Sequence, residues 1–197
     1  MLAGVIFCAS MPLEAQRLLD RIVGRVNGAA ITLTDVNAAI ALGIVQSSGT
    51  ADRTAIDQMV ERQLMLGEVA RFVPPEPSEA EVARETASLI AYAGPRLPEI
   101  MAVTGIDRER IREIARENLR IQAYLNLRFG ANVQLTEEEV AQYYRIHPEE
   151  FTRNGMLLPF TEAEPLARER AGADRRATTI AQWMRDLRSR ADISLPR

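Results

Sequence analysis

The sequence contains no lysine, so all 24 of its basic side chains are arginine. Arginine is specifically favoured where planar, bidentate or stacked contacts are made. A GC-rich genome accounts for a lysine-free chain more simply, and we interpret the bias in that way. The 24 basic and 27 acidic residues leave a net charge of -3, which argues against a strong nucleic-acid binder.

Cysteine and histidine occur once each, as Cys8 and His147. A single cysteine excludes an internal disulfide and any zinc site built from several cysteines. A single histidine excludes a site with several histidine ligands. Its position directly before Pro148 is typical of a residue at the end of a helix. We therefore predict neither a metal site nor a catalytic histidine.

Motifs of nucleotide and nucleophile chemistry are missing as well. The glycines form no phosphate-binding loop, and no serine lies in a nucleophile-elbow setting. The acidic cluster 137–139 falls in the first turn of an expected helix, where negative charge is favoured. The mixed arginines and glutamates of 108–120 are typical of a solvent-exposed helix surface. We therefore expect no catalytic residue and no cofactor, and a protein that is not an enzyme.

The N-terminal segment is a short apolar run from Leu2 to Ala9. It is too short for a transmembrane helix, which takes roughly 20 apolar residues, but it matches the apolar region of a secretory signal peptide. We predict a signal peptide over residues 1–15 and a mature chain without a transmembrane segment. Because no basic residue precedes the run, we expect the true start upstream. The alternative is an ordinary buried N-terminal segment.

A β-hairpin is expected at the start of the mature chain. Residues 22–26 and 29–33 flank Asn27-Gly28, a dipeptide typical of two-residue hairpin turns. The expected cross-strand pairs are Val26 with Ala29, Gly24 with Ile31, and Ile22 with Leu33. These six residues then share one apolar face.

Such a hairpin needs a partner, because an isolated one is only marginally stable in water. At the C-terminus, Ile193 and Leu195 alternate with polar residues and predict a third strand. The apolar face of the last helix, which carries Ile180, Trp183, Met184 and Leu187, is expected to cover the sheet.

Between the two ends, capping residues and apolar periodicity predict a succession of helices. The expected helices run from Thr34 to about Val45, from about Ile56 to before Pro74, from Ser78 to Gly94, from Leu97 to about Val103, from Asp107 onward, from Thr136 to His147, and from near Thr161 with Glu164 as capping partner. The predicted fold class is therefore mainly α, with a small N-terminal β-hairpin joined by a C-terminal strand.

Several segments, taken in order, resemble SurA-like periplasmic chaperones. They are Arg21–Gly28 followed by Ile31–Val36, Ile56–Leu64, Leu135–Val140, Tyr143-Tyr144 through His147–Phe151, and Trp183–Arg188 with Ile193. The resemblance covers nearly the whole mature chain. It implies one helical chaperone domain over 16–197, in which an N-terminal part (16–151) packs against a C-terminal helix and strand (161–197).

The chain departs from that family in one large respect. SurA-like proteins normally carry parvulin-type prolyl isomerase domains after the Pro-Glu-Glu-Phe region, but here only about ten residues separate Phe151 from the last helix. The histidine pair of a parvulin cannot exist in a chain with one histidine. Isomerase activity is therefore not expected.

The resemblance implies an ATP-independent periplasmic chaperone that binds unfolded or outer-membrane protein segments. Methionine and tyrosine side chains suit such adaptable binding, although core packing is the alternative role for the methionines. The candidate client-binding residues are Met59, Met65, Tyr92, Met101, Tyr143 and Tyr144. Two other functions stay open, a prolyl isomerase relative without its catalytic domain and a structural or adaptor subunit of an envelope complex, as does a homodimer.

Overall fold

The computed structural model describes residues 20–47, 49–130 and 134–196, so the predicted signal peptide lies outside the described residues. The elements are β1 (Ile22–Val26), β2 (Ala29–Thr32), α1 (Leu33–Ala41), α2 (Arg53–Phe72), α3 (Glu79–Ala93), η1 (Gly94–Arg96), α4 (Leu97–Thr104), α5 (Arg108–Phe129), α6 (Glu137–Ile146), η2 (Pro148–Phe151), β3 (Thr152–Arg153), β4 (Met156–Leu157), α7 (Phe160–Arg190) and β5 (Ile193–Ser194). The predicted fold class is confirmed: the protein is mainly α-helical with a small antiparallel sheet. None of the described helices is both long enough and apolar enough to cross a membrane.

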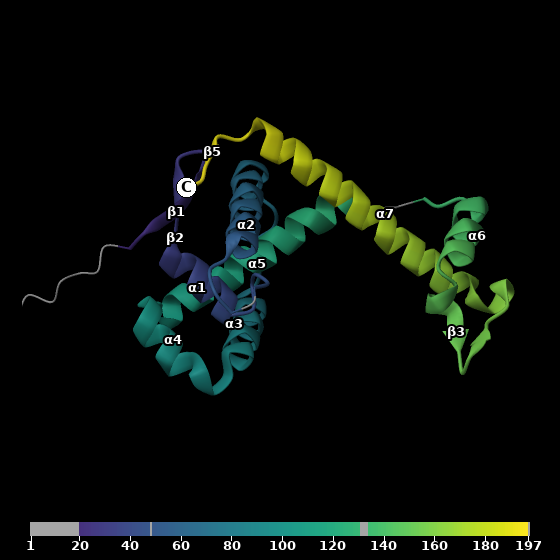
Figure 1. Cartoon of the computed structure of the whole chain (residues 1–197), viewed down its shortest axis with the longest axis horizontal. Helices are drawn as coiled ribbons and strands as arrows, with labels where there is room; N and C mark the ends of the chain where they lie inside the picture. The colour runs from purple at the N-terminus through teal and green to yellow at the C-terminus, as the bar shows by residue number, and fades with distance from the viewer. Residues whose placement is uncertain (1–19, 48, 131–133, 197) are drawn as a thin grey trace, which may run out of the picture.

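The chain forms two lobes that share the long helix α7 (Figure 1). The first lobe contains α1 to α5, the sheet and the C-terminal half of α7. The second contains α6, η2, the β3–β4 hairpin and the N-terminal half of α7, and it has its own small core. The segment 137–151, which the resemblance assigns to the N-terminal part, therefore packs on α7 away from the first lobe.

The small sheet joins both ends of the described chain in the order β2-β1-β5. Asn27 and Gly28 have positive φ angles, as the turn requires. The predicted pairs Val26 with Ala29 and Gly24 with Ile31 are confirmed, and β5 pairs antiparallel with β1.

The third predicted pair is wrong. Ile22 lies opposite Thr32 rather than Leu33, because the register shifts between Ile22 and Gly24. An extra residue in one strand reverses the alternation of faces beyond it. Val23 is consequently buried, and Ile22 is exposed.

The main core lies between the sheet and three helices. Val23, Val26 and Ile31 belong to the same buried cluster as Trp183 and Leu187 of the last helix. The helix that packs most closely on β1 and β2 is α2, however, and not the last helix, which was predicted to cover them. Residues of α2 and α5 complete this cluster, namely Val60, Leu64, Val69, Ile121 and Tyr124. A second cluster joins α1, α3, α4 and α5.

Most of the predicted helix caps are present. Ser78 and Thr136 form capping boxes with Glu81 and Glu139, and the side chain of Asp107 caps α5. The helix over 97–104 ends at Gly105, whose backbone is left-handed. These starts and stops depend on contacts within one turn, which local sequence specifies.

Two predicted caps are wrong. The N-cap of α1 is Thr32, whose hydroxyl accepts a hydrogen bond from the Asp35 backbone N–H at 3.1 Å, and not Thr34. That helix ends at Ala41 rather than near Val45, since Gly43 adopts a φ of +71°. Helix α7 begins at Phe160, after Pro159, without a side-chain cap. Glu164, its expected capping partner, instead pairs with Arg168 at 3.0 Å.

Candidate functional site

The first candidate site is an apolar hollow between α2 and α7, called here the α2–α7 hollow. It has a volume of about 580 Å³. Helix α7 contributes most of its walls, and α5 contributes one leucine. Its lining residues are Glu61, Met65, Leu125, Ala177, Ile180, Ala181, Met184, Arg185 and Arg188. Ala177 and Ala181 are small and exposed, Ile180, Met65 and Leu125 are half-buried, and Met184 is buried.

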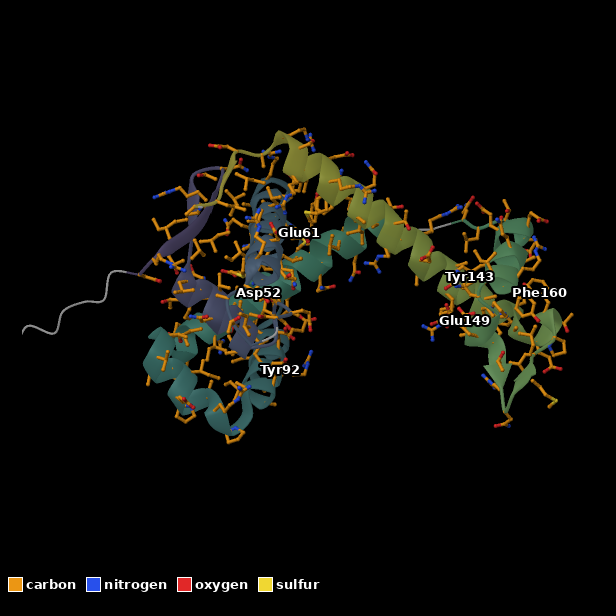
Figure 2. All side chains as sticks on the ribbon, in the orientation of Figure 1. Asp52, Glu61, Tyr92, Tyr143, Glu149 and Phe160 are labelled. Atoms are coloured by element: carbon orange, nitrogen blue, oxygen red, sulfur yellow. The ribbon has the colours of Figure 1, made fainter. Side chains whose placement is uncertain are left out.

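A second hollow of about 410 Å³ lies between α2, α3 and α5, beside the first one. We call it the α2–α3 hollow. Its lining residues are Gly43, Ile44, Val45, Gln58, Glu61, Arg62, Met65, Glu85, Leu89, Asn118, Ile121 and Gln122. Glu61 and Met65 line both hollows, so the two form one continuous surface across α2. Figure 2 shows Glu61 on α2, close to α7.

Two kinds of charge border these hollows. Arg188 is paired with Asp57 at 2.6 Å. Arg185 reaches only the side-chain oxygen of Gln182, at 2.6 Å. The side chain of Glu61 makes no hydrogen bond and no ion pair to any described residue.

Arg62 occupies the base of the α2–α3 hollow with its side chain almost buried. Its guanidinium donates hydrogen bonds to Glu117 at 2.9 Å and to Asn118 at 2.5 Å. Burial lowers the pKa of Arg62, while the charge of Glu117 and the hydrogen bond to it oppose that effect. The positive charge of Arg62 is therefore already matched by a carboxylate.

The six predicted client-binding residues do not gather on one surface. Met65 alone among them lines both hollows of α2. Met59 lines a third hollow of about 360 Å³, which is bordered by β2, α1, α2 and the α4–α5 turn and shares Ile44 and Arg62 with the α2–α3 hollow. Met101 packs half-buried against the second core cluster. The Tyr92 ring is exposed and rests on Gly43, at the margin of the α2–α3 hollow.

Tyr143 and Tyr144 lie in the second lobe, where Figure 2 shows Tyr143 far from Glu61. The Tyr144 hydroxyl donates to the Leu158 carbonyl at 2.5 Å, and its ring packs against Phe151 and Phe160. Tyr144 is therefore a structural residue. Tyr143 lines a hollow between α6 and α7. Burial raises its pKa to about 12, with a further contribution from its hydrogen bond to Glu150.

The predicted set omitted the residues that form most of the α2–α7 hollow. Ile180 and Met184 were recognised as part of the apolar face of the last helix but were assigned to covering the sheet. Ala177 and Ala181 carry no signal of their own in the sequence. The apolar face of α7 is wider than one partner helix can cover. That width is the feature of the sequence that would have indicated Ala177 and Ala181.

One group of described residues has the geometry of a metal site. The Nδ1 atom of His147 lies 3.5 Å from a Glu149 oxygen and 3.8 Å from a Glu150 oxygen. Glu150 is already engaged, because it accepts a hydrogen bond from the Tyr143 hydroxyl at 2.9 Å and lies 3.8 Å from Arg170. An arginine at this distance opposes the binding of a second cation.

Comparison with known proteins does not assign the chain to a family. Neither a protein-family model nor a curated protein sequence matches the chain. The α2 hollows are thus described by their own chemistry. They offer accessible methionine and small aliphatic side chains, bordered by charges of both signs.

Proposed function

We propose that this protein is an ATP-independent chaperone that holds unfolded polypeptide segments, with Met65 at the centre of its binding surface. The observation that carries the proposal is the pair of hollows that share Met65 and Glu61 on α2. Methionine is flexible and polarizable, so it fits side chains of different shape. The resemblance to SurA-like chaperones supports the further proposal that the protein acts in the periplasm on outer-membrane proteins.

The size of the hollows suits this activity. Volumes of about 410 and 580 Å³ lie within the usual range of ligand pockets, roughly 300–1,000 Å³, so each hollow can take one or two apolar side chains of a client. Burying one large aliphatic side chain contributes about 1.5–3 kcal/mol, part of which is offset by the ordering of the client. Each contact is therefore weak, as release without ATP requires.

Aggregation of an unfolded outer-membrane protein on dilution from urea, measured by light scattering without ATP, tests the proposal. The unaltered chain should suppress it at near-stoichiometric concentration. Ala181→Glu places a carboxylate in the α2–α7 hollow at an exposed helix position, so the helix should persist while suppression falls. Ala173→Glu, exposed on the same helix and outside both hollows, is the matched control and should keep full activity.

Two results would contradict the proposal. If the unaltered chain does not suppress aggregation, the proposed chaperone function is wrong. Co-purification with one envelope protein in a fixed ratio would then favour an adaptor subunit. Equal loss in Ala181→Glu and Ala173→Glu would remove the hollow as the binding surface. A prolyl isomerisation assay on the same preparation should show only the uncatalysed rate, since one histidine cannot form the histidine pair of a parvulin site.

A further inference from the structure

The two hollows beside α2 differ in charge. The α2–α3 hollow is lined by the carboxylates of Glu61 and Glu85, and its one basic residue is Arg62. Arg62 is matched by Glu117 at 2.9 Å. Glu85 accepts a hydrogen bond from the neutral Asn118 side chain at 3.1 Å, and it has no ion pair among the described residues. This hollow therefore carries two carboxylates that no cation neutralises.

The α2–α7 hollow has a different balance of charge. Its border includes Arg185, whose guanidinium has only the uncharged Gln182 as a described partner, and Arg188, which is paired with Asp57. Glu61, shared with the α2–α3 hollow, is its only carboxylate, and its other lining residues are aliphatic or methionine side chains. A basic side chain is thus disfavoured beside Arg185 and favoured between Glu61 and Glu85, where two carboxylates lie.

The distance between the hollows defines the spacing of a client's side chains. They adjoin along α2 and share Glu61 and Met65, so their separation is at most the width of a helix with its side chains, about 10 Å. An extended polypeptide covers roughly 3.3 Å per residue. Two client residues about three positions apart therefore reach the two hollows at once.

We propose that this surface prefers extended segments in which an apolar side chain is followed or preceded, about three residues away, by arginine or lysine. The apolar side chain occupies the α2–α7 hollow, and the basic side chain lies between Glu61 and Glu85 in the α2–α3 hollow. This preference rests on the proposed chaperone function and adds to it the class of client segment.

Binding of short fluorescent peptides to the full chain, followed by anisotropy, tests the preference. The peptides carry two adjacent leucines in a glycine–serine background, with arginine, glutamine or glutamate three residues away. At low ionic strength the arginine peptide should bind about threefold to tenfold more tightly than the glutamine peptide, as expected for two partly exposed carboxylates. The glutamate peptide should bind most weakly, and about 1 M salt should remove most of the difference.

Variants of the chain assign the effect to the hollow. Glu61→Gln and Glu85→Gln should each reduce the ratio of the affinity for the arginine peptide to the affinity for the glutamine peptide. Glu169→Gln changes the net charge equally at an exposed position on α7 outside both hollows, and should have no effect.

The outcomes separate the two proposals. If the leucine–glutamine peptide binds and arginine adds nothing, the chaperone function stands and the preference is wrong. Equal effects of Glu61→Gln and Glu169→Gln would also overturn it, because attraction would then come from net charge alone. If none of the peptides binds, both proposals fail.

Discussion

Arg62 shows what a guanidinium does in this lysine-free chain. Its two terminal nitrogens reach Asn118 at 2.5 Å, Glu117 at 2.9 Å and the Ile114 carbonyl at 3.5 Å, so one side chain ties α2 to three positions of α5. A lysine ammonium is a single point on a flexible stem and cannot hold this forked arrangement. Whatever the origin of the arginine bias, the geometry at this position depends on it.

Replacing Arg62 with lysine should therefore lower the free energy of unfolding by about 1–2 kcal/mol, because at least one hydrogen bond to a charged or buried partner is lost. Arg62→Leu should cost more, since Asn118 then loses its charged donor and Glu117 keeps only Arg110, at 3.3 Å. Urea denaturation followed by Trp183 fluorescence measures both. A control is Arg145→Lys, whose exposed pair with Glu138 should contribute little. Equal midpoints for Arg62→Lys and the unaltered chain would contradict this account.

Helix α7 is the element that connects the lobes, and it does so with two different faces. In its first half the buried residues are Ala163, Ala167 and Ala171, spaced four apart. In its second half they include Trp183 and Leu187. Sixteen residues from Ala167 to Trp183 correspond to about four and a half turns, which moves the buried stripe to roughly the opposite side of the helix. The two lobes therefore bind opposite sides of α7.

The alanine stripe makes a prediction about the second lobe. Ala167 is fully buried against α6, so Ala167→Leu should overpack that core and cost about 1–3 kcal/mol. The only tryptophan, Trp183, lies in the first lobe, so its fluorescence should stay native while hydrogen exchange in α6 accelerates. Ala173→Leu, at an exposed position, should change neither. If the native Trp183 fluorescence and the hydrogen-exchange protection of α6 are lost at the same denaturant concentration, the two lobes do not unfold independently and this prediction is wrong.

At the scale of the whole molecule, the sheet closes the first lobe by bringing the C-terminus to the first strand. Ile193 lies opposite Val26, and the backbone N–H of Asn27 donates to the Asp192 carbonyl at 2.8 Å. The side chain of Leu195 covers Gly24 so closely that a Cβ there would lie 2.9 Å from it. The C-terminal strand thus completes both the hydrogen bonding and the packing of β1.

Deleting residues 192–197 should lower the free energy of unfolding by about 2–4 kcal/mol, because two half-buried aliphatic side chains and several backbone hydrogen bonds are lost. The newly exposed edge of β1 should also increase aggregation. The measurement is a urea melt of the truncated and full chains, with light scattering at the midpoint. An unchanged midpoint would mean that β5 does not stabilise the lobe.

Features that depend on neighbours within one turn or across a tight loop were predictable from the amino-acid order. Asn27-Gly28 specified the hairpin, and the capping boxes at Ser78 and Thr136 specified where α3 and α6 begin. The pairing of Ile193 with β1 was also predictable, because alternating side chains require a sheet to bury them. Each of these features has a local chemical cause that a single sequence displays.

The register shift at Ile22, the cap at Thr32 and the candidate binding surface depend instead on contacts between distant segments. The shift and the cap depend on how β1, β2 and α1 meet in space. The surface depends on α2 and α7, whose pair Asp57 and Arg188 is separated by 131 residues. Alanines at 177 and 181 become the walls of a hollow because α2 approaches that side of α7 without covering it. The periodicity of apolar residues along one helix does not show how much of its surface a neighbouring helix covers.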